Sequence, residues 1–155
     1  MTLAKHGQTT RRWDNVRKAA QIGVALQVIC IALPLLDLWV FGTVERHVQR
    51  AYPEWGPETV ALDRNAIVIY LAIVGVLGLV AWLGTIWATK RDWRVRGTVT
   101  TLFVAGMGLL VLDAGLGGEA YDQIVPLWLG LTLLVIPALP GVTALVAAWS
   151  GQQQR

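Results

Sequence analysis

The sequence has very little of what enzymes and cofactor-binding proteins commonly use. Among its 155 residues there are one cysteine and two histidines. The single Cys30 excludes an intramolecular disulfide, a cysteine-based metal site and a dithiol redox pair. No Ser-His-Asp or Cys-His arrangement and no nucleotide-binding motif is present, so most hydrolytic mechanisms lack a nucleophile or a base. We therefore expect a protein without enzymatic activity, cofactor or metal, and modification of a lipid is the one enzymatic alternative left open.

Charge is also missing from long stretches of the chain, and these stretches define the fold class. Four blocks are almost wholly apolar: 19–41, 66–88, 98–116 and 124–149. About 20 apolar residues in a helix cross the roughly 30 Å hydrocarbon layer of a bilayer. The sequence predicts an all-α integral membrane protein, an antiparallel bundle of four transmembrane helices in one domain, 1–155. The first block is too long for a signal peptide, so we expect it to be retained.

The basic residues predict which parts of the chain are cytoplasmic. Of the 13 lysines and arginines, ten lie in the tail 1–18, between the second and third blocks, or at the C-terminus. Cytoplasmic loops are enriched in these residues. We predict a multi-pass protein of the cell (inner or plasma) membrane, with both termini in the cytoplasm and 42–65 as an external loop.

The same basic segments also bear on the partners. Lysines and arginines beside a transmembrane helix attract anionic lipid headgroups, so we expect such lipids as partners within the lipid bilayer. The net charge is +3, but its distribution follows the topology of the membrane. We therefore expect no nucleic acid partner.

Breakers and small residues predict the shape and packing of the helices. Nothing stops the first helix before Pro53, so we expect it to extend past the membrane, and Pro57 suits the first turn of the second helix. Pro137 and Pro140 each remove a backbone donor and predict a kink in the fourth helix. Membrane helices approach one another through small residues, and we assign this role to five glycines: Gly75, Gly78, Gly106, Gly130 and Gly141.

Polar residues within the apolar blocks are the candidates for function, since ionisable groups in a membrane are costly. Asp37 and Asp113 lie at similar depth near the outer boundary, and Arg64 lies at nearly the same level. They predict an outer cluster for an ion or a ligand, although shallow acids can also face water or fix a helix end. Gln27 is the deepest strongly polar residue of the first helix. It is expected to bond across a helix interface or to line a pathway.

Besides the modification of a lipid, two functions remain at this point. The first is an interaction role, as an oligomer of this chain or as an accessory subunit of a larger membrane complex. The alternative is a small transporter or a binding protein for an ion or ligand, using Asp37, Asp113 and Arg64. The sequence alone favours the first, because no acid lies deep in a span.

Overall fold

The computed structural model describes residues 2–91, 94–115 and 123–150, with side chains from Trp13 onward except those of 113 and 114. The elements are α1 (Thr2–Leu36), η1 (Asp37–Phe41), α2 (Thr43–Ala51), α3 (Pro57–Arg91), α4 (Val95–Gly115) and α5 (Leu127–Trp149). All are α-helices except η1, a single π-helical turn, and the described residues form no strand. This confirms the prediction of an all-helical chain.

Four of these helices are long and apolar enough to cross a membrane. The candidate spans are Trp13–Phe41, Pro57–Arg91, Val95–Leu112 and Leu127–Trp149. Each overlaps one of the four apolar blocks of the sequence, so the prediction of four long apolar helices is also confirmed.

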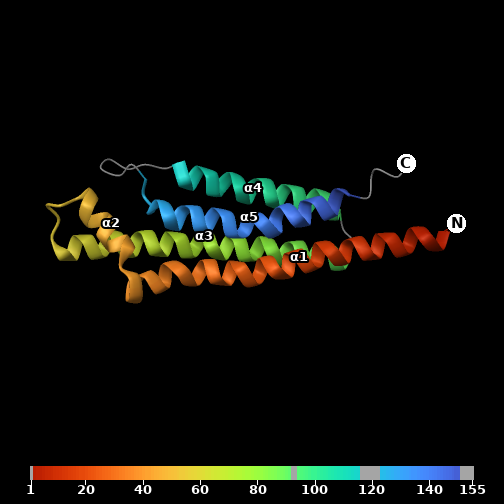
Figure 1. Cartoon of the computed structure of the whole chain (residues 1–155), viewed down its shortest axis with the longest axis horizontal. Helices are drawn as coiled ribbons and strands as arrows, with labels where there is room; N and C mark the ends of the chain where they lie inside the picture. The colour runs from red at the N-terminus through yellow and green to blue at the C-terminus, as the bar shows by residue number, and fades with distance from the viewer. Residues whose placement is uncertain (1, 92–93, 116–122, 151–155) are drawn as a thin grey trace.

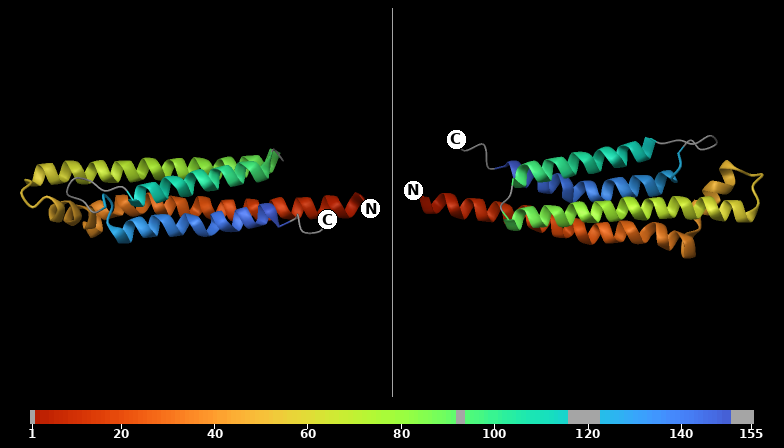
Figure 2. Two further views of the ribbon diagram at one scale, coloured as in Figure 1. Left: turned by 90° about the horizontal axis from the view of Figure 1, so that it is seen from above. Right: turned by 180° about the vertical axis from the view of Figure 1, so that it is seen from behind.

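The long helices lie along one common axis and alternate in direction (Figure 1). α1 packs against α3 and α5, and α4 packs against α5 and α3. The two further views in Figure 2 show the same four-helix arrangement, with the first turns of α1 projecting beyond the others. Each long helix therefore contacts two of the others.

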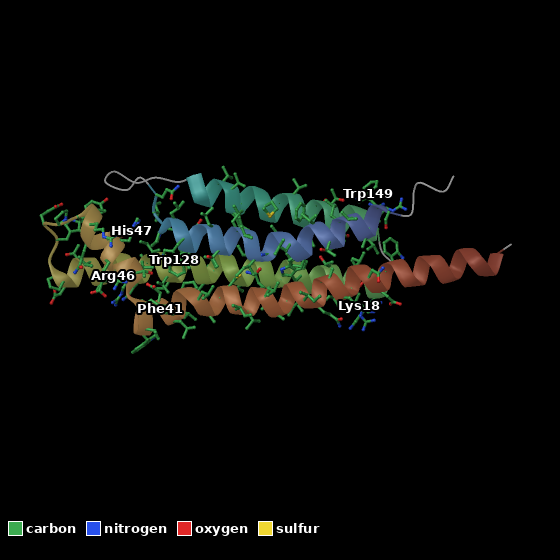
Figure 3. The ribbon with its side chains drawn as sticks, viewed as in Figure 1. Lys18, Phe41, Arg46, His47, Trp128 and Trp149 are labelled. Carbon is green, nitrogen blue, oxygen red and sulfur yellow. The ribbon has the colours of Figure 1, made fainter. Side chains whose placement is uncertain are left out.

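Two buried apolar clusters hold the ends of the four helices together. One gathers residues of α1, of the start of α4 and of the end of α5, and consists of Val16, Ala19, Val95, Val99, Ala144 and Ala148. The other joins α2 to the starts of α3 and α5, and consists of Val44, Val48, Val60, Ile67, Leu71, Val125 and Leu129. We call them the basic-end cluster and the α2-end cluster, because Lys18 lies near the first and Arg46 and His47 on α2 near the second (Figure 3).

The first helix does not extend to Pro53 as expected. It ends at Leu36, two residues after the buried Pro34, and the chain passes through the π-helical turn into Gly42. Gly42 adopts a left-handed conformation with φ 58°, which favours glycine because it has no Cβ. The chain then starts a separate helix, α2. The early start of α3 at Pro57, in contrast, is confirmed.

Candidate functional site

Asp37 is the first residue of η1, directly after the end of α1, and is completely buried. Its carboxylate accepts hydrogen bonds from the backbone N–H groups of Thr43 (3.1 Å) and Val44 (2.8 Å), and from the hydroxyl of Thr43. These N–H groups open α2 and have no partner within that helix. The helix dipole also favours a negative charge at this position. Asp37 thus caps α2 across the turn, and each carboxylate oxygen is already engaged.

The structure does not bring Arg64 to Asp37. Arg64 Nη1 donates to Glu45 Oε2 at 2.6 Å, and its Nε and Nη2 donate to Asn65. The Glu45 side chain is 42% exposed, so this ion pair contributes less than about 1 kcal/mol. Asp113 belongs to α4, but its side chain lies outside the described residues. The two members of the predicted outer cluster that are described therefore each join α2 to the rest of the chain.

α2 packs against η1 and the start of α3, and its inner face also meets the start of α5. Val44 and Val48 on its inner face are fully buried in the α2-end cluster. His47 Nε2 lies 2.8 Å from the carbonyl oxygen of Gln123, just before α5. Beyond the turn, Trp39 is 87% exposed and Phe41 points away from the bundle (Figure 3). This end is therefore closed by apolar and polar contacts together.

The predicted packing glycines fall into two groups. At Gly75, Gly78 and Gly141 an added Cβ would lie 2.6 to 2.8 Å from the side chains of Ile31, Gln27 and Phe103, respectively. At Gly106 it would meet nothing within 4 Å, and at Gly130 only Val125 at 4.0 Å. The role in helix packing stays a prediction for these glycines, and the space beside Gly106 and Gly130 is not filled by a described side chain.

A glycine of α1 that was not among those five makes the closest such contact. An added Cβ on Gly23 would lie 2.5 Å from the indole ring of Trp82 on α3. The large Trp82 side chain fits there because Gly23 on α1 has no side chain. The pairing of a large residue with a glycine across two helices is a tertiary feature that spacing along one helix does not reveal.

A cavity of about 270 Å³ lies in the middle of the protein, between α3, α4 and α5, with α1 contributing Gln27 and Cys30. This volume is near the lower end of the range of small-molecule sites, about 300 to 1,000 Å³. Small residues on three helices line much of it: Gly75, Gly78, Ala81, Ala105, Gly106, Gly141 and Ala144. It extends along α3 from Leu71 to Thr85, roughly 21 Å at about 1.5 Å per residue.

The wall of the cavity is apolar with few exceptions. No aspartate, glutamate, lysine, arginine or histidine of the described residues lines it. The Thr85 hydroxyl is already engaged, since it donates to the Ala81 carbonyl at 3.0 Å. Gln27 is 6% exposed and lies against Gly78. Within the described part of the chain its amide has no hydrogen-bond partner.

The cavity opens sideways between α3 and α4. Leu77 on α3 is 55% exposed and Leu109 on α4 is 38% exposed, yet both line it. The adjoining outer surface carries exposed Val80, Val104 and Leu112, so it is apolar as well. In a bilayer such an opening would face hydrocarbon, and an apolar molecule could enter from that side.

Comparisons with known proteins add no family and no fold neighbour. No protein-family model, curated protein or solved structure matches this chain. The function must therefore be argued from the site itself.

Proposed function

We propose that this chain is a small four-span membrane protein that binds an uncharged lipophilic molecule in the cavity between α3, α4 and α5. The observation that carries the proposal is the cavity itself, which has mostly apolar walls and the Gln27 amide, which has no hydrogen-bond partner among the described residues. Ligand sites are typically concave, mostly apolar and provided with a few polar groups. Ligand binding was the alternative function that the sequence predicted. The proposed site lies in the middle of the four-helix region and not at the outer cluster of Asp37, Asp113 and Arg64.

An ion site at Asp37 and Arg64 is disfavoured. Asp37 already accepts three hydrogen bonds and Arg64 already pairs with Glu45. An ion at this position would have to compete with the groups that start α2. The interaction role, as an oligomer or accessory subunit, stays a prediction, because exposed valines, leucines and isoleucines suit lipid and a partner helix equally.

The proposed arrangement in the cell membrane is an antiparallel bundle with both termini in the cytoplasm and a kink in α5 at Pro137 and Pro140. The basic residues at the end that holds the basic-end cluster support this orientation. Single cysteines in a Cys30→Ala background test it. A membrane-impermeant maleimide added to intact cells should label Glu54→Cys and leave Ser150→Cys unlabelled. The reverse pattern would overturn the orientation.

The binding proposal is tested by filling the cavity. Gly106 lines it and has open space around it, so Gly106→Leu should occupy the cavity without a clash. Gly108 lies two residues away on α4, is exposed, has equally open surroundings and does not line the cavity. Gly108→Leu is therefore a matched control for the added leucine.

Each variant is extracted with its surrounding lipid in polymer nanodiscs, and the apolar small molecules are quantified per chain by mass spectrometry. We expect one compound enriched over bulk lipid in the wild type and in Gly108→Leu, and reduced at least about tenfold in Gly106→Leu. An identical set of molecules in identical amounts in all three proteins would contradict the proposal.

A further inference from the structure

From the position of Gln27 we infer the class of molecule that the cavity takes: an uncharged, chain-like lipophile with one carbonyl group near its middle, held by the Gln27 amide. This inference rests on the proposed function, because it requires that the cavity is a binding site. It is carried by three features of the described residues: the lack of charge in the wall, the shape of the cavity, and the depth of the unpartnered amide.

The lack of charge decides against an ionised ligand. The cavity wall contains no acidic, basic or histidine side chain of the described residues. Moving an ion from water into a medium of low dielectric constant is unfavourable by many kcal/mol unless an opposite charge is present. Among the described residues, a free fatty acid anion, an amine or a phosphate headgroup would find no counter-ion in this wall. The ligand must therefore be neutral.

The shape of the cavity and the depth of the Gln27 amide together determine where the polar group of the ligand lies. The cavity follows α3 for roughly 21 Å, between Leu71 and Thr85. Gln27 lies against Gly78, which is midway between these two residues. Apolar wall thus extends roughly 10 Å from the amide in both directions. A polar group at the end of a chain would leave half of the cavity empty, whereas a polar group near the middle lets both arms fill it.

The chemistry of the amide decides what that polar group is. A buried polar group without a partner destabilises the protein unless a ligand or water satisfies it. The Gln27 amide offers two N–H donors and one carbonyl acceptor. The lipid hydrocarbon around the opening supplies no acceptor. A ketone, ester or amide carbonyl at this depth would accept a hydrogen bond from Nε2, and a plain alkyl chain would leave it unpaired.

The test uses a matched set of probes with the protein in lipid nanodiscs. Tritiated 9-heptadecanone carries a carbonyl at its centre, heptadecane has the same chain without the oxygen, and stearate has a similar chain with a terminal charge. Saturable binding above that of empty nanodiscs is measured for the wild type and for Gln27→Met, which keeps an unbranched side chain against Gly78. Gln49→Met, at an exposed amide on α2, is the matched control.

We expect the ketone to bind the wild type and Gln49→Met about fivefold more tightly than heptadecane. In Gln27→Met the two probes should bind equally, and stearate should not bind saturably to any variant. With a ¹³C-labelled carbonyl, the infrared stretch of the bound ketone should shift to lower frequency in the wild type and return to its value in lipid in Gln27→Met.

The remaining outcomes separate the two proposals. Equal saturable binding of ketone and hydrocarbon in the wild type, unchanged in Gln27→Met, would overturn the carbonyl inference and leave the cavity as a binding site. Saturable stearate binding as tight as that of the ketone would overturn the neutral class. No saturable binding of any probe, in wild type and variants alike, would overturn the proposed function together with the inference.

Discussion

The end of the molecule covered by α2 and the middle of the four-helix region are built on different principles. At the α2 end, Asp37, Glu45 and His47 each make a defined polar contact across elements, and the α2-end cluster is buried beneath them. In the middle, the helices touch through bare glycine backbone against large side chains, and a cavity of about 270 Å³ remains.

The difference follows from where the backbone hydrogen bonds can be made. Within a long helix every N–H and C=O is satisfied locally, so the middle needs only close packing between helices. Where α1 stops and α2 starts, N–H groups lose their partners and side chains must supply them. Polar residues are therefore retained at the α2 end for structure. An unpartnered polar residue in the middle, such as Gln27, has no such explanation.

The sharpest test of this contrast is Asp37→Ala. It removes a buried carboxylate and leaves the N–H groups of Thr43 and Val44 without partners at the start of α2. We expect the free energy of unfolding to fall by about 3 kcal/mol, measured by titration with SDS in mixed micelles and followed by circular dichroism. Asp37→Asn should lose roughly half as much, because its amide retains one acceptor oxygen.

The control for this experiment is Glu54→Ala, which removes an exposed acid from the segment between α2 and α3. It should change the free energy of unfolding by less than about 0.5 kcal/mol. If Asp37→Ala were no more destabilising than Glu54→Ala, the carboxylate would not be a structural cap. Its role as part of an outer ion site would then regain support.

A smaller effect is expected in the middle, where Gly23→Ala and Gly106→Ala form a matched pair. The added Cβ on Gly23 would lie 2.5 Å from the Trp82 ring, so α1 and α3 must move apart. We expect a loss of about 2 kcal/mol in the same titration. Gly106→Ala meets nothing within 4 Å and should leave stability unchanged or raise it by up to about 1 kcal/mol through helix propensity. If both variants lost the same free energy of unfolding, glycines that contact a neighbouring side chain could not be distinguished from glycines beside open space.

Much of the fold follows from the sequence because each long apolar block must satisfy its own backbone in a membrane. The four helices were predictable for this reason, and the start of α3 was predictable because Pro57 suits a first helical turn. The break between α1 and α2 was not, although Gly42 and the sequence of Asp37, Thr43 and Val44 contain its components. Recognising it requires knowing that a carboxylate six residues earlier turns back onto the N–H groups of α2.

The candidate site was predicted less well. Asp37 and Arg64 were chosen because ionisable residues near a membrane are unusual, and that argument cannot distinguish a structural cap from a binding group. Gln27 was singled out for its depth, with bonding across an interface as the preferred role. Its position in a cavity was not foreseen, since a stripe of small residues on one helix looks the same whether a neighbour fills it or not.

The sequence by itself determined that this chain has four long apolar helices, because hydrophobic length and backbone hydrogen bonding are properties of each segment alone. Only the tertiary structure decided which polar residues are already engaged and which are not. It placed Asp37 on the N–H groups of α2 and Arg64 on Glu45, and it left Gln27 beside unfilled space. The physical reason is that partners and cavities are set by side chains from different helices, whose relative heights and rotations no single segment encodes.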